Sequence, residues 1–147
     1  MPNPPSSRTL ARVPELVVRL QRLGHAARLV DRTERRRVPE RVGATAFDLL
    51  EGMVDVIERR GRARQHLVVR LRVEDGMLIV SVQSTAAPGS QDPVLRGDPE
   101  EPRARARVEA LGGDLTGLPT AGHGWIWIAR LPLAPPAPDG VPGAAAG

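Results

Sequence analysis

Residues 38–60, VPERVGATAFDLLEGMVDVIERR, are the longest part of the chain with a single helical period. Apolar residues recur in this stretch at three- and four-residue steps and define one stripe about 100° wide. The stripe consists of Val42, Ala46, Leu49, Leu50, Met53 and Ile57. Pro39 is typical of a first helical turn, and Gly61 is typical of a helix end. The pattern therefore predicts a long amphipathic helix whose apolar face packs against a sheet.

Weaker patterns on both sides of this helix predict the sheet and two shorter helices. The predicted elements, in chain order, are a helix at 13–23, a strand at 26–31, the long helix, strands at 66–73 and 77–83, a helix at 103–111, and strands at 114–118 and 125–131. Asp75-Gly76 is a preferred two-residue hairpin turn. Residues 84–102 carry four prolines and no period, so we expect a long loop there. Helices on one face of a mixed, mostly antiparallel sheet would make a two-layer α/β sandwich.

The composition indicates one domain with short tails. A chain of 147 residues is long enough to bury a core. We expect the domain at 9–133, with the segments 1–8 and 134–147, rich in Pro, Ala and Gly, being flexible. The sequence contains no cysteine, which excludes disulfides and thiolate chemistry. Nothing approaches the ~20 apolar residues of a membrane span, so we expect a cytoplasmic protein without membrane insertion.

The order of elements and three local sequences resemble the ATP-binding domain of sensor histidine kinases, the GHKL or Bergerat-fold ATPases, especially the kinases of LuxR/NarL-type response regulators. The most specific match is RVEALGG at 107–113, followed after a small-residue loop by GWIWIARLP at 124–132. Residues 38–42 look like the entry to the family's ATP-site helix. Glu51 matches the acidic residue that opens the family's N box. The resemblance covers roughly 13–133 and implies the Bergerat fold.

The resemblance places the magnesium position of the family at Asp55. In the family, an asparagine at this position holds the Mg²⁺ that bridges the nucleotide phosphates. Asp55 is also an oxygen ligand, but it adds a negative charge beside a triphosphate. The following family position, normally basic, is Glu58. These replacements disfavour Mg-nucleotide, and an acidic, solvated helix turn becomes the favoured interpretation.

The adenine and phosphate positions are also replaced. The family's aspartate, which accepts a hydrogen bond from the adenine amino group, corresponds to Ser84, whose neutral hydrogen bond would be weaker. Of the family's glycine-rich lid, which binds phosphates through free N–H groups, only Gly97 remains. Pro99 and Pro102 supply no N–H group. We expect nearby carboxylates to cap the next helix in place of a phosphate.

These observations predict a stand-alone, degenerate histidine-kinase-like ATPase domain without catalysis or cofactor. It would act as a regulatory protein-interaction module in bacterial signalling or transcription control, a pathway assignment that rests on resemblance alone. The alternative is the ATP-binding domain of a sensor histidine kinase or anti-sigma-type kinase that binds Mg-ATP through an atypical site. In that case Glu51 and Asp55 would hold Mg²⁺.

The last predicted strand is apolar on both faces, which suggests an interaction surface at Trp125, Ile126, Trp127 and Ile128. One face of such a strand belongs to the core, and paired tryptophans are most often core residues. Ile126 and Ile128, together with Val68, would then form an exposed patch for a protein partner or a second copy.

Two other kinds of site are less favoured. Acids are interleaved among the arginines and no aromatic platform exists, so nucleic-acid binding is unlikely. The three histidines, His25, His66 and His123, are too scattered for a metal cluster, and we expect them at the surface or in turns.

Overall fold

The structure is a computed structural model of the chain, and it describes residues 9–34, 38–60, 64–86, 100–120 and 124–134. The elements within these ranges are η1 (Leu10–Arg12), α1 (Val13–Arg22), β1 (Ala26–Arg32), α2 (Glu40–Arg60), β2 (Gln65–Glu74), β3 (Met77–Ala86), α3 (Glu100–Ala110), β4 (Asp114–Thr120) and β5 (Gly124–Pro132). The terminal segments predicted to be flexible lie outside the described residues, apart from Ala134.

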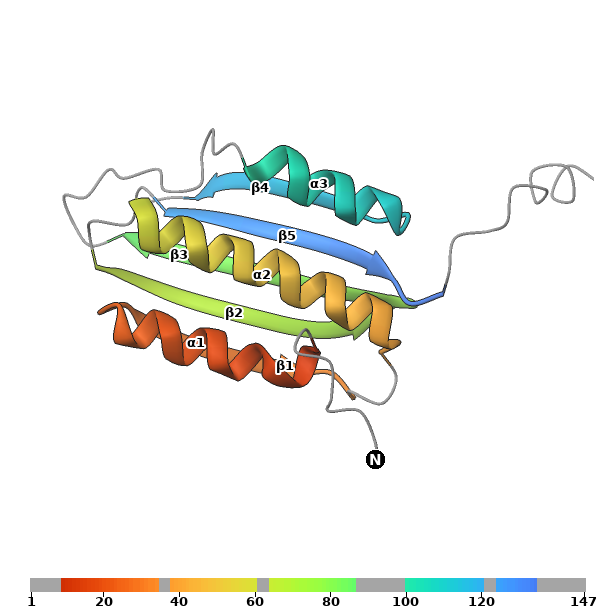
Figure 1. Cartoon of the computed structure of the whole chain (residues 1–147), viewed down its shortest axis with the longest axis horizontal. Helices are drawn as coiled ribbons and strands as arrows, with labels where there is room; N and C mark the ends of the chain where they lie inside the picture. The colour runs from red at the N-terminus through yellow and green to blue at the C-terminus, as the bar shows by residue number, and fades with distance from the viewer. Residues whose placement is uncertain (1–8, 35–37, 61–63, 87–99, 121–123, 135–147) are drawn as a thin grey trace, which may run out of the picture.

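The five strands form one sheet in the order β1-β2-β3-β5-β4. β1 is parallel to β2, and the other neighbours are antiparallel. Figure 1 shows α1, α2 and α3 on the same side of this sheet, with α2 between the other two. The predicted two-layer α/β sandwich is therefore confirmed.

The apolar stripe of α2 forms the centre of the core. All six residues of the predicted stripe are at most 4% exposed. The helix begins at Glu40, two residues after the predicted start, and the carbonyl of Pro39 accepts hydrogen bonds from the N–H groups of Val42 and Gly43. Because the stripe is continuous, one face of α2 packs along the sheet over the full length of the helix.

The strands alternate as predicted, and their inner faces complete the core. The buried inner side chains are Leu67, Val69 and Leu71 of β2, Leu78, Val80 and Val82 of β3, Leu115 of β4, and Trp125, Trp127, Ala129 and Leu131 of β5. The hairpin turn is also as predicted, with positive φ at Asp75 (52°) and Gly76 (74°). Such angles match the type I′ turn that Asp-Gly favours.

The loop predicted at 84–102 is shorter than expected. Ser84, Thr85 and Ala86 belong to β3, where they pair with residues 65–67 of β2, and Ser84 also pairs with Trp125. At the other side, α3 begins at Glu100 rather than at residue 103. Pro102 lies in the first turn of α3. Backbone N–H groups in a first turn have no partner within the helix, so the N–H group that proline lacks costs no helical hydrogen bond. Proline content alone was therefore a poor guide to these boundaries.

Candidate functional site

The residues that the resemblance assigns to a nucleotide site lie towards one end of the molecule. At this end α2 finishes, β2 begins, β3 finishes, and β5 and α3 begin (Figure 1, left). Glu51 and Asp55 belong to the second half of α2, and Ser84 lies near the end of β3. Gly97 lies outside the described residues. The structure thus shows the surroundings of three of the four predicted positions.

Asp55 is part of an ion-paired cluster that joins α1 to α2, which we call the α1–α2 clasp: Arg19, Asp55 and Glu58. The Arg19 Nη2 atom lies 2.6 Å from Asp55 Oδ1 and 2.6 Å from Glu58 Oε1. The Arg19 Nε atom also donates to Glu58 Oε1 at 3.2 Å. The hydrogen bonds that Arg19 donates, first to Glu58 and then to Asp55, raise the pKa of Arg19. Asp55 and Glu58 are three residues apart, so both point to the same neighbouring helix.

The clasp is half-exposed and was not predicted. The side chains of Arg19, Asp55 and Glu58 are 36%, 50% and 44% exposed. Asp55 and Glu58 lie at the surface of α2, but the sequence gave no signal for Arg19, which is one of two arginines in α1. Arg19 and Asp55 are 36 positions apart and belong to different helices. Their contact depends on the tertiary structure, which the periodicity of a helix does not predict.

Glu51 lies on the same side of α2, near the start of α1. Its charge is the weakest of the causes that raise the pKa of Arg12, and the first is the hydrogen bond of Arg12 to Glu15. Arg12 Nε and Glu15 Oε2 are 2.7 Å apart. The predicted magnesium ligands therefore face the arginines of the η1–α1 segment.

In this arrangement the carboxylate of Asp55 is already paired within the chain. Within the described ranges, no group of three or more His, Cys, Asp or Glu side chains is placed to hold a metal ion. The Oδ1 atom of Asp55 is already bound by a guanidinium group. A magnesium ion that took the Oδ1 atom of Asp55 would displace the guanidinium group of Arg19 and break the hydrogen bond between Arg19 and Asp55.

Ser84 is buried and is bound within the protein. It is 1% exposed, and its hydroxyl donates a short hydrogen bond to Oε1 of Gln65, which is also 1% exposed. Gly124 lies against the Ser84 carbonyl so closely that an added Cβ atom would overlap with it. The hydroxyl at the predicted adenine position is thus engaged by a side chain of this chain.

Gln65 also connects this position to His25. The backbone N–H group of Gln65 donates to His25 Nδ1 at 3.2 Å. The prediction of a surface or turn histidine is wrong for His25, which is 7% exposed, because this hydrogen bond satisfies the ring at the end of α1. Burial, and then the charge of Arg64, lower the pKa of His25. His66 is exposed, and His123 lies outside the described residues.

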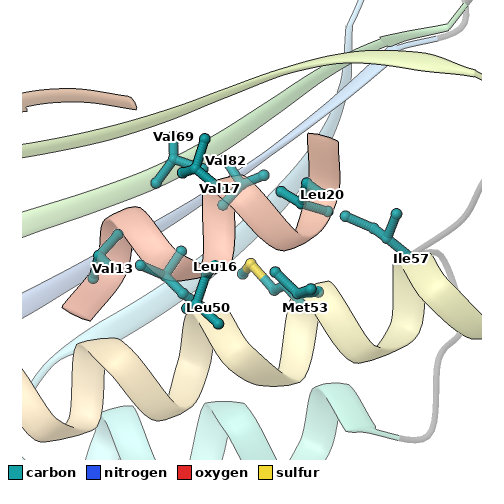
Figure 2. A pocket seen from close by; sticks show the side chains of 10 residues that line it. Val13, Leu16, Val17, Leu20, Leu50, Met53, Ile57, Val69 and Val82 are labelled. Atoms are coloured by element: carbon teal, nitrogen blue, oxygen red, sulfur yellow. The ribbon is translucent and has the colours of Figure 1, made fainter. Parts of the chain in front are cut away.

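A small pocket lies in the core, between α1, α2 and the sheet. Figure 2 shows its lining side chains pointing towards one another from both helices and from two strands. All ten are apolar: Val13, Leu16, Val17, Leu20, Leu50, Met53, Val54, Ile57, Val69 and Val82. Its volume is about 10 Å³, roughly the space of one water molecule. This pocket is a packing gap in the core and cannot hold a nucleotide.

The sheet face opposite the helices, which we call the open face, carries part of the predicted interaction surface. Ile126, Ile128 and Val68 point to this face and are partly exposed, as is Ile79. Leu118, which pairs with Ile126, is 51% exposed. The prediction missed Leu118 and Ile79, although the same alternation along β3 and β4 would have indicated them.

The two tryptophans of the predicted interaction surface point to the core instead. Trp125 and Trp127 are 8% and 7% exposed, on the helical side of β5. Gly117 makes room for the Trp127 ring, whose Nε1 atom lies 3.1 Å from where a Gly117 Cβ atom would be. Only Ile126 and Ile128 of the four predicted residues are therefore available for contact with a partner.

Comparison with known proteins identifies the fold. No protein-family model matches the chain, and no curated protein matches it. Among solved structures, the histidine kinase domain of the blue-light activated histidine kinase EL346 from Erythrobacter litoralis is 21% identical, with a TM-score of 0.59. The match covers 90% of this chain and 66% of that chain. This chain therefore spans less than two thirds of the first of these kinases.

Histidine kinase ThkA gives a second match that spans almost the whole of the compared domain. Its nucleotide-free catalytic domain is 15% identical with a TM-score of 0.63, and the match covers 86% of this chain and 94% of that chain. ThkA in complex with the response regulator TrrA is 16% identical with a TM-score of 0.59, covering 85% and 40%. The protein thus has the α/β fold of the catalytic domains of histidine kinases, which is the fold that the resemblance implied.

In the described residues, no helix is both long enough and apolar enough to cross a membrane.

Proposed function

We propose that this domain has lost the use of its nucleotide site and acts as a non-catalytic regulatory module that binds another protein, in bacterial signalling or transcription control. The observation that carries the proposal is the α1–α2 clasp. Asp55, the residue at the family's magnesium position, is held by Arg19 at 2.6 Å. A carboxylate that neutralises an arginine of its own chain is poorly suited to attract the magnesium of a nucleotide.

The second position supports the same conclusion. Ser84 is 1% exposed and donates its proton to Gln65. This buried hydroxyl, already hydrogen-bonded to Gln65, is a neutral and less accessible acceptor for an adenine amino group than the family's aspartate. Each charge-assisted contact that is lost costs about 1.5–3 kcal/mol, whereas micromolar affinity is about 8 kcal/mol in total. The loss of the magnesium contact and of the adenine contact would therefore leave about 2–5 kcal/mol, a dissociation constant of roughly 0.2 mM or weaker.

A protein partner is the occupant that the fold favours. ThkA, which shares the fold, has been solved in complex with a response regulator protein. A domain of this class without nucleotide could retain such a role, and a homodimer is the other possibility. Light scattering separates the two, because a homodimer doubles the mass of the purified protein.

Calorimetric titration with Mg-ATP and with Mg-ADP tests the proposal. We expect no binding tighter than about 100 μM. The alternative, an atypical site that still binds Mg-ATP, is favoured by the fold alone. It predicts binding that disappears in Asp55→Ala and persists in the control Glu109→Ala, which removes an exposed carboxylate from α3. That pair of results would refute the proposal.

A further inference from the structure

The open face of the sheet places a row of apolar side chains beside a group of arginines. The strand registers bring Arg28, Val68, Gln83, Ile126 and Leu118 into one row across the five strands. The next row is Val30, Arg70, Ser81, Ile128 and Thr116, and the third is Arg32, Arg72, Ile79, Arg130 and Asp114. The arginines gather on β1 and β2, and the larger apolar side chains gather on β4 and β5.

The arginines of this face exceed its carboxylates. Arg72 lies 3.3 Å from Glu74, and Arg130 lies 3.7 Å from Asp114. Arg70 donates to the neutral Gln83 Oε1 at 3.0 Å. Within the described ranges, the exposed Arg28 and Arg32 have no carboxylate within ion-pair distance.

The apolar part of the face has the dimensions of a short helix contact. From Val68 to Leu118 the first row crosses four strands, about 14 Å at ~4.8 Å per strand. That length corresponds to between two and three helical turns at ~5.4 Å each. An amphipathic helix with apolar anchors at i, i+3 or i+4, and i+7 would cover about 10 Å of this length.

Charge decides between the possible occupants. A second copy in a two-fold interface would bring this arginine-rich face against itself, which like charges disfavour. Nucleic acid would leave the apolar row without a contact, and both tryptophans are in the core, so neither can stack on a base. A protein segment with carboxylates beside its apolar residues complements both halves of the face.

We propose that the open face binds an acidic amphipathic helix of a partner protein, with its apolar residues over Ile126, Ile128 and Leu118 and its carboxylates at Arg28 and Arg32. This inference rests on the proposed function, since it names the chemistry of the partner. It also assigns a role to two arginines on the edge strand β1. Without a partner, these arginines would only protect the sheet edge from pairing with another chain.

The test uses the full chain and a synthetic peptide of about three helical turns, with leucine on one face and glutamate elsewhere. We expect binding that shifts the amide resonances of β5 and β4, including those of Ile126 and Leu118. The double variant Arg28→Glu/Arg32→Glu should weaken binding by about tenfold or more. The control Arg22→Glu/Arg107→Glu changes charge equally on the exposed helical side and should leave the affinity unchanged.

Several outcomes would overturn the inference. Equal binding of a peptide with lysine in place of glutamate would show that charge does not contribute to the affinity. Resonance shifts confined to the helices would show that the peptide does not bind to the open face. Equal loss of affinity in both double variants would show a non-specific charge effect. A doubled mass without peptide, or stronger binding to duplex DNA or to vesicles with anionic lipid, would assign the face to another occupant. Mg-ATP binding together with peptide binding would refute the proposed function but not this inference.

Discussion

Removing the cation of the α1–α2 clasp should destabilise the fold by a small, measurable amount. In Arg19→Ala, Asp55 and Glu58 lose their shared partner, two contacts of 2.6 Å. At this separation a Coulomb energy of roughly 1.5–6 kcal/mol per pair would apply between water and the protein surface. All three side chains are more than a third exposed, so solvent screening reduces this to about 0.5–1 kcal/mol per pair. We therefore expect Arg19→Ala to lower the free energy of unfolding by about 1–2 kcal/mol.

A double-mutant cycle in urea unfolding isolates the contact that bears on function. Arg19→Ala and Asp55→Ala together should be less destabilising than the sum of the single variants, with a coupling of about 0.5–1 kcal/mol at low salt. Added salt should reduce the coupling because both groups are exposed. A coupling of zero at low salt would refute the assignment of Asp55 to the clasp.

Asp55→Asn links the clasp to nucleotide binding, because it restores the family's residue without changing the size of the side chain. If Asp55 serves the clasp, Asp55→Asn loses about 0.5–1 kcal/mol of stability and gains no Mg-ATP binding in calorimetry. If Asp55 is a metal ligand at an atypical site, the same change removes a charge beside the triphosphate. Tighter Mg-ATP binding in Asp55→Asn would therefore contradict our reasoning.

Four further predictions concern the buried polar cluster and the glycines. Because burial lowers the pKa of His25 below its ordinary value of 6.5, the unfolded chain binds the proton more tightly. Stability in urea should then fall as the pH drops below about 6.5, and this loss should vanish in His25→Asn but persist in His66→Asn. Gly52→Ala should stabilise the protein by roughly 0.5–1 kcal/mol, because nothing lies within 4 Å of the added Cβ in α2. Gly124→Ala should destabilise it, because the added Cβ overlaps with the Ser84 carbonyl; thermal unfolding of the two variants in opposite directions checks both. Ser84→Asp should destabilise the protein more at pH 7 than at pH 4, because a carboxyl group at this 1% exposed position would have a raised pKa; equal effects at both pH values would show that the charge is solvated.

The sequence predicted those parts of the fold that depend on local period. The apolar stripe of α2 predicted which residues are buried, because every third or fourth residue of such a helix faces the sheet. All six residues of the stripe are buried. The Asp75-Gly76 hairpin was predictable because two positive φ angles restrict the residue types. The order of elements then sufficed for the two-layer sandwich, before any contact between elements was known.

The chemistry of the site was less predictable because it depends on contacts between elements. Arg19 and Asp55 belong to different helices, and neither helix pattern says which outer faces are neighbours. Ser84 was assigned to a loop because it follows a strand and precedes prolines, but pairing with Trp125 and a hydrogen bond to Gln65 hold it in β3. A buried serine with an internal partner has no sequence signature that distinguishes it from a serine in a turn.

The distribution of ion pairs separates the two faces of the domain. On the helical side, Arg19 is paired with Asp55 and Glu58 and Arg12 is paired with Glu15, so these arginines stabilise the fold. On the open face Arg28 and Arg32 have no carboxylate within ion-pair distance in the described ranges, and their removal should cost the fold almost nothing. Ionic strength therefore distinguishes the contribution of the arginines from that of the apolar residues. Added salt should weaken the peptide complex, because it weakens the attraction to Arg28 and Arg32. The apolar contacts at Ile126 and Leu118 should remain. Affinity that did not change with salt would mean that the apolar row alone holds the partner.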